Sequence, residues 1–124
     1  MSKQAYIQNV IDWVRLRGYS AIKANAADYT MPASYGRQLD GQSFVPDVTG
    51  QQGDQKSYFE IVLKTKDTDY LTVKLKLLHQ LAQLSGGQLF LMTPKGHSLF
   101  AKAIADANRI TAEIIILPDI KKMG

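Results

Sequence analysis

The chain has 124 residues, a formal net charge of +4 and no cysteine. Its length predicts a single domain over residues 1–124, and the lack of cysteine excludes disulfides, thiolate catalysis and zinc–thiolate sites. The mild positive charge is compatible with a polyanionic partner, while the absence of a signal peptide and of any run near the ~20 apolar residues of a membrane span favours a cytoplasmic protein with no membrane partner.

The first predicted element is a helix over residues 3–17. Apolar residues recur in it at the spacing of one helical stripe, namely Ile7, Val10, Ile11 and Val14. Ser2 is placed to cap this helix, and Gly18 stands where a helix-ending glycine is expected. A short strand is expected over residues 19–23. Residues 25–42 mix turn formers with aromatic residues and predict a long loop, with or without a short irregular strand.

Residues 44–66 predict a β-hairpin, because two runs rich in β-branched and aromatic residues flank a polar turn at residues 51–55. Side chains two apart on a strand share a face. One face of the second strand is apolar and must be buried; it holds Phe59, Ile61 and Leu63. The other face holds Tyr58, Glu60, Val62 and Lys64. This second face has a carboxylate where a plain buried strand would have Val or Ile, and a closed hairpin can bring Asp47 beside Glu60.

The second half of the chain alternates helices with short apolar runs. A helix capped by Thr68 or Asp69 is expected to run to about Ser85. Its two adjoining apolar stripes predict burial against a sheet and against a further helix or a second subunit. The remaining predicted elements are a central strand at 88–93, a helix at 99–109 and a buried strand at 112–117.

The order of these elements predicts the fold class. Buried runs that alternate with helices indicate parallel strands in the second half, whereas the hairpin indicates antiparallel strands in the first half. The sequence therefore predicts an α/β domain with a mixed β-sheet flanked by helices on both sides, in the order α-β-β-β-α-β-α-β.

This order, with Pro46-Asp47 on one hairpin strand, Glu60 on the next and the GGQLFLMTPKG strand and turn further on, resembles the core of the PD-(D/E)XK, or restriction-endonuclease-like, nuclease superfamily. The resemblance covers most of the chain at the level of topology. It implies a domain that binds nucleic acid, DNA in the first place, and hydrolyses phosphodiester bonds with Mg²⁺ or Mn²⁺. Small members of the superfamily often act as dimers, so a homodimer is expected.

The resemblance also implies roles for particular residues. Asp47 and Glu60 would be the metal carboxylates, and the backbone carbonyl of Ile61 would be a further ligand. Glu60 has a structural alternative, an ion pair without metal to Lys64, Lys23 or Arg37.

The sequence departs from the superfamily pattern at one position. A lysine that positions water or stabilises transition-state charge is expected two residues after Glu60, but the chain has Val62 there. Lys64 shares the face of Glu60 and is the expected catalytic substitute, with Lys74 or Lys76 on the next helix as alternatives. Val62 also favours a competing interpretation, a catalytically inactive nuclease-fold protein that acts as a DNA-binding or protein-interaction module.

Basic residues around the predicted site are the candidates for contact with nucleic acid, and they are Arg37, Lys66, Lys74 and Lys95. His97 lies in the same turn as Lys95, for which phosphate contact and a solvated turn both stay open. The chain has no sequence motif of a nucleoside-triphosphate, dinucleotide or zinc-protease site.

Overall fold

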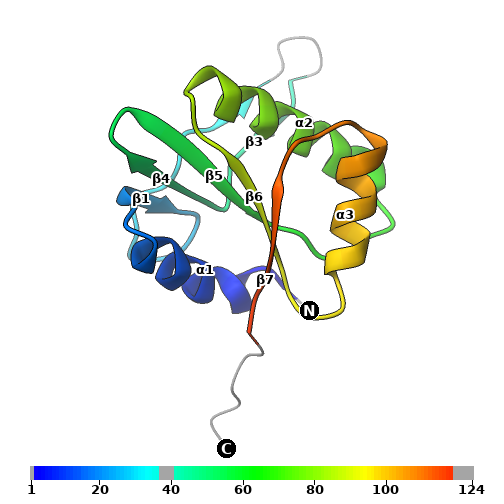
Figure 1. Ribbon diagram of the computed structural model, residues 1–124, viewed down its shortest axis with the longest axis horizontal. Coiled ribbons are helices and arrows are strands. Elements are labelled where there is room, and N and C mark those ends of the chain that lie inside the picture. The colour runs from blue at the N-terminus through cyan, green and yellow to red at the C-terminus, as the bar shows by residue number, and fades with distance from the viewer. Residues whose placement is uncertain (1, 37–40, 119–124) are drawn as a thin grey trace, which may run out of the picture.

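The computed structural model describes residues 2–36 and 41–118 (Figure 1). In this part of the chain the helices are α1 (Gln4–Leu16), α2 (Thr68–Leu84) and α3 (Ser98–Ala107). The strands are β1 (Ser20–Ala24), β2 (Tyr35–Gly36), β3 (Ser43–Phe44), β4 (Val48–Gln52), β5 (Gln55–Ile61), β6 (Leu89–Thr93) and β7 (Glu113–Ile116). The predicted α/β class is confirmed.

Five of these strands form one sheet in the order β1-β4-β5-β6-β7, and β2 pairs with β3 in a separate small sheet. The pairs β1–β4 and β4–β5 are antiparallel. The pairs β5–β6 and β6–β7 are parallel, because α2 and α3 carry the chain back to the same end of the sheet before each new strand. The mixed sheet expected from the hairpin and from the alternating second half is therefore confirmed.

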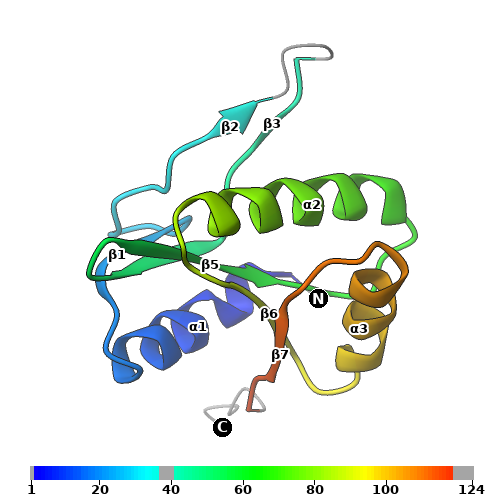
Figure 2. The same cartoon turned by 45° about the horizontal axis from the view of Figure 1, so that its top comes forward.

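The sheet is covered on both faces, with α1 on one side and α2 and α3 on the other (Figure 2). The core under α1 includes Phe59 and Ile61, and the core under α2 and α3 includes Tyr58 and Val62. This alternation is the one predicted for the second hairpin strand. Phe59 stacks on Phe90 of the neighbouring strand, with ring centroids 4.8 Å apart. Strand β5 is thus buried on both faces, and a polar side chain on it needs a partner.

Helix caps differ from the sequence prediction. The N-cap of α2 is Asp67, whose side chain accepts a hydrogen bond from the Tyr70 N–H at 3.2 Å, and not Thr68 or Asp69. The N-cap of α1 is Lys3, which makes no side-chain cap bond, and not Ser2. In both cases residue preferences could not resolve the boundary to within one position.

The predicted long loop at 25–42 contains β2 in its described part. The β2–β3 sheet extends away from the main sheet on the α2 side (Figure 2). Tyr35 ties it to β5, because its hydroxyl lies 3.3 Å from that of Tyr58 and accepts a hydrogen bond from Lys56 Nζ at 2.9 Å. Arg37, predicted to contact nucleic acid, lies outside the described residues.

Helix α2 buries only part of its predicted apolar surface. Leu71, Leu75, Leu78 and Ala82 are buried against the sheet. In the second stripe Leu84 keeps 85% of its surface exposed, and the predicted homodimer stays a prediction.

Among the described residues, no helix combines the length and the apolar character that a membrane crossing requires.

Candidate metal and nucleic-acid site

Two carboxylates meet where β4 begins and β5 ends. Asp47 directly precedes β4, Glu60 is the second-last residue of β5, and both are buried. The backbone N–H of Asp47 donates to Glu60 Oε1 at 3.0 Å, and the N–H of Ile61 donates to Asp47 Oδ2 at 2.8 Å. The side-by-side placement expected from a closed hairpin is confirmed. These two backbone donors orient the carboxylates independently of any other side chain.

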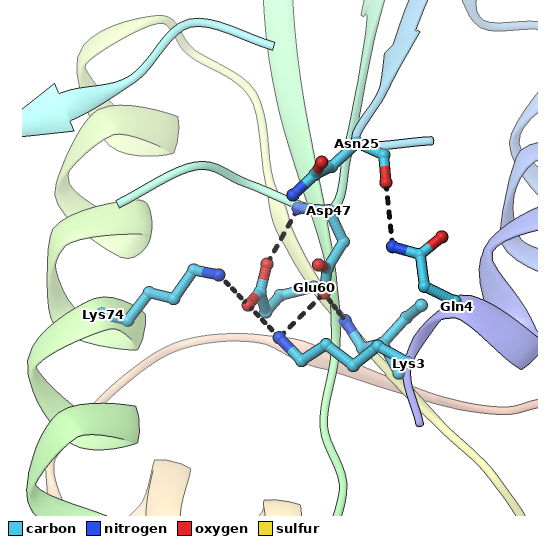
Figure 3. A network of polar contacts seen from close by, with 7 residues as sticks. Lys3, Gln4, Asn25, Asp47, Glu60 and Lys74 are labelled. Carbon is cyan, nitrogen blue, oxygen red and sulfur yellow. Dashed lines mark hydrogen bonds and ion pairs between the residues drawn. The ribbon is translucent and has the colours of Figure 1, made fainter. Parts of the chain in front are cut away.

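Two lysines from different helices complete the cluster (Figure 3). Lys3 Nζ at the start of α1 lies 2.8 Å from Glu60 Oε2 and 3.1 Å from Asp47 Oδ2. Lys74 Nζ from α2 lies 2.6 Å from Glu60 Oε2. We call Lys3, Asp47, Glu60 and Lys74 the charge cluster. Figure 3 shows the two ammonium groups approaching the carboxylates from opposite helices.

The lysines and the burial act in opposite directions on the carboxylates. Burial alone would raise the pKa of Glu60, but Lys3 and Lys74 hold that pKa below its ordinary value, so Glu60 is an anion. Burial, and then the negative charge of Glu60, raise the pKa of Asp47 to about 7. Burial disfavours the charged form of Lys3, yet Glu60 and Asp47 raise the pKa of this lysine above its ordinary value. The two lysines thus favour the ionised form of Glu60, which is the carboxylate that both of them contact.

One of the two lysines beside Glu60 comes from α2, the helix on which the sequence offered alternatives. Lys74 was one of two alternatives predicted on this helix, and its side chain is 8% exposed. Lys76, the other, is exposed. Lys64 lies beyond the end of β5 and is exposed as well, and in the described part of the chain no hydrogen bond or ion pair joins its side chain to Glu60. Because the strand ends at Ile61, the face shared by Glu60 and Lys64 in an extended strand does not continue to Lys64.

The position of the missing motif lysine is occupied by Val62, a side chain of the hydrophobic core. Val62 is fully buried in the cluster that includes Leu75 and Leu78 of α2. A lysine at this position would have its aliphatic part among leucines. Among the described residues the ion-pair partners of Glu60 are Lys3 and Lys74, and not the expected Lys64 or Lys23; the third expected partner, Arg37, lies outside the described residues.

The participation of Lys3 was missed from the sequence. This residue is separated from Glu60 by 57 positions along the chain, and a lysine near a helix start is common on protein surfaces. Only the packing of α1 beneath the sheet brings it to the hairpin. The one signal available was the lack of a local acidic partner in the first turn of α1, which does not point to any particular residue.

A groove of about 460 Å³ opens beside the charge cluster, and both cluster lysines line it. Lys64, Tyr70 and His97 line it too. The Lys64 N–H donates to His97 Nδ1 at 2.9 Å, so the neutral imidazole carries its proton on Nε2 and keeps one donor for a ligand. The groove lining thus includes three lysines, a histidine donor and one acidic residue, Asp67. Lys66 and Lys95, also predicted to contact nucleic acid, are exposed on the flanking turns.

The donor set of the charge cluster fits a small divalent metal. Among residues 2–36 and 41–118 no group of three or more His, Asp and Glu side chains gathers, so a metal at this position would have the two carboxylates as its charged protein ligands. Mg²⁺ is commonly held by one or two carboxylates, with waters and substrate phosphates completing its shell. That the pair accepts a shared cation is visible in the Lys3 ammonium, which contacts both carboxylates. The roles of Asp47, Glu60 and the Ile61 carbonyl as ligands stay predictions.

Comparison with known proteins gives no match among protein-family models, curated proteins or solved structures. The fold and the geometry of the charge cluster are therefore the grounds on which a function can be proposed for this chain.

Proposed function

We propose that the chain is a restriction-endonuclease-like domain that binds nucleic acid, DNA in the first place, and hydrolyses its phosphodiester bonds with Mg²⁺ or Mn²⁺. One observation carries the proposal. A buried lysine from the helix after the hairpin, Lys74, lies 2.6 Å from Glu60 in a paired-carboxylate site. The site thereby has the two carboxylates and the ammonium group that this chemistry needs, although Val62 stands at the usual lysine position.

The fold supports the same proposal. The antiparallel hairpin continues through α2, β6, α3 and β7 as a parallel sheet. This is the order of elements in which the chain resembles the nuclease superfamily. The carboxylates lie where β4 begins and β5 ends, and their two lysine partners, Lys3 and Lys74, line the groove.

The residues of the site would divide the tasks of the proposed reaction among them. Asp47 and Glu60 would hold the metal, which when bound supplies charge neutralisation at the phosphate and a water acidic enough to react near neutral pH. Lys74 places a fixed positive charge beside Glu60, where it stabilises negative charge that develops on the phosphate. Lys64 and the Nε2–H of His97, which line the groove, would bind neighbouring phosphates.

The test is a cleavage assay with Mg²⁺ and with Mn²⁺ on supercoiled, linear and branched DNA. Cleavage by the wild type is expected to fall at least a hundredfold in Asp47→Asn, Glu60→Gln and Lys74→Met. Lys76→Met is the matched control, because Lys76 lies on the same helix, is exposed and carries the same charge. Cleavage that survives in Glu60→Gln would contradict the proposal, since a contaminating nuclease would then be responsible.

A second candidate function is nucleic-acid binding without cleavage. The observation that favours it is the internal charge balance of the cluster, in which two lysines face two carboxylates. Binding through phosphate contacts weakens steeply with salt. DNA affinity that falls by orders of magnitude between 50 and 200 mM salt, with no cleavage in either metal, would favour this binding module. Affinity independent of salt would instead indicate a protein-interaction module.

A further inference from the structure

The ammonium group of Lys3 bridges the two carboxylates. It lies 2.8 Å from Glu60 Oε2 and 3.1 Å from Asp47 Oδ2 (Figure 3). Lys74, in contrast, has Glu60 as its ion-pair partner among the described residues. A positive charge shared by both carboxylates occupies the position that a metal ligated by the pair would need.

The carboxylates do not depend on Lys3 for their orientation. Asp47 accepts from the Ile61 N–H, and Glu60 accepts from the Asp47 N–H and from Lys74. These contacts come from the hairpin backbone and from α2. The pair therefore keeps its geometry when the Lys3 side chain moves away.

The Lys3 side chain also has access to solvent, into which its charged end could move. Its side chain is 36% exposed, against 8% for Lys74, and it lines the 460 Å³ groove. A long flexible side chain with partial solvent access can turn its charged end into water, and an incoming cation would take over its two ion pairs. Both lysines line the groove, but Lys3 is much the more exposed of the two.

Charge balance indicates which lysine would leave. With Glu60 and Asp47 both ionised, the two ammonium groups neutralise the cluster. Adding a divalent cation would give it a net charge of +2 in a buried position, which is unfavourable. Departure of the more exposed ammonium, that of Lys3, lowers the charge and frees the two oxygens that the cation needs.

We propose that Lys3 holds the cation position between Asp47 and Glu60 and gives it up when a divalent metal binds. The inference depends on the proposed function, because it concerns the same pair of carboxylates. It makes Lys3, which is not part of the superfamily motif, a competitor of the metal for Asp47 and Glu60. Metal affinity is then set partly by the fraction of molecules in which Lys3 has left the pair.

The first test measures Mn²⁺ binding from the electron paramagnetic resonance signal of free Mn²⁺, with Mn²⁺ alone as the ligand. Lys3→Met, which keeps the length and removes the charge, is expected to bind about tenfold tighter than the wild type. Lys76→Met, the matched control, should bind like the wild type, and Glu60→Gln should not bind. Equal or weaker binding in Lys3→Met overturns the inference while leaving the metal site standing. Absence of binding in both the wild type and Lys3→Met overturns the metal site and the inference together.

A second test uses the wild type, so that it does not depend on the folding of a variant. Acetic anhydride labels free amines, and mass spectrometry of peptides gives the rate at each lysine. Saturating Mn²⁺ is expected to raise the labelling rate of Lys3 severalfold and to leave that of Lys76 unchanged. A Lys3 rate that does not change while Mn²⁺ binds would overturn the exchange.

Discussion

Replacing Lys74 by methionine tests whether the ion pair with Glu60 is as buried and as direct as the structure indicates. The substitution keeps a long unbranched side chain and removes the charge that lies 2.6 Å from Glu60 Oε2. Glu60 itself is fully buried. In Lys74→Met this anion would keep Lys3 and the Asp47 N–H as its partners.

The expected loss follows from burial. Removing one member of a buried ion pair costs about 3–5 kcal/mol, because it leaves a charge without compensation in a site shielded from water. Lys3 still compensates part of the charge, and methionine fills most of the vacated volume. We therefore expect a loss of unfolding free energy at the low end, about 3 kcal/mol, which for a domain of this size corresponds to roughly 10 °C in melting temperature.

The assay is urea unfolding of the wild type, Lys74→Met, Glu60→Gln and the double variant. The cost of Lys74→Met should fall to about 1 kcal/mol when Glu60 is already glutamine, a coupling of about 2 kcal/mol between the two side chains. Lys76→Met, an exposed control on the same helix, should change stability by less than about 0.5 kcal/mol. A Lys74→Met variant as stable as this control would refute the buried pair.

Three further predictions concern Asp47, Val62 and Gly87. The pKa of Asp47 is raised from 3.8 to about 7. Between pH 4 and 7 the folded protein therefore keeps a proton on Asp47 that the unfolded chain has released. The free energy of unfolding of the wild type should consequently fall as pH rises through this range, by at most about 1.4 kcal/mol per pH unit. In urea titrations Asp47→Asn should remove that component, and an unchanged slope would contradict it. Val62→Lys, which would complete the superfamily motif, should instead cost about 3–5 kcal/mol in urea unfolding, because Val62 is buried among leucines; near-wild-type stability would show that the site has room for the motif lysine. Gly87→Ala should lower the melting temperature by more than 10 °C, because a Cβ there would fall on the Lys56 carbonyl, whereas alanine at Gly53, in open space at the hairpin turn, meets only the modest strain of a positive φ.

The architecture could be predicted from the sequence because its signals are local. The period-2 alternation around Phe59 and the apolar stripe of α1 each specify one element and the face that it buries. Pairing of β4 with β5 then follows because the two strands are consecutive in the sequence and a short turn joins them. Single-residue boundaries could not be predicted from capping preferences: Asp67, Thr68 and Asp69 are all good N-cap residues, and α1 begins after Lys3, which makes no side-chain cap bond, although Ser2 is the better cap residue.

The candidate site could be predicted only where it is local. Asp47 and Glu60 belong to one hairpin, so their proximity follows from closing it. The two lysines come from helices on opposite faces of the sheet, and their approach depends on how those helices pack. Lys64 was preferred from the sequence because an extended strand was assumed to continue past Ile61, but β5 ends there. The sequence could place Lys74 and Lys76 on the helix after the hairpin, but it could not show which of them turns toward Glu60.

The energetics of the charge cluster distinguish a site from a structural support. Burying charges is expensive, and a well-packed apolar group of the same volume is often as stabilising as a buried ion pair. This sheet already has two apolar cores, and Val62, two residues from Glu60, shows that the same strand face accepts an aliphatic side chain. Folding alone therefore gives no reason to place two carboxylates and two ammonium groups at this position. The proposed function would supply such a reason, because a metal-bound phosphodiester in the neighbouring groove needs both signs of charge.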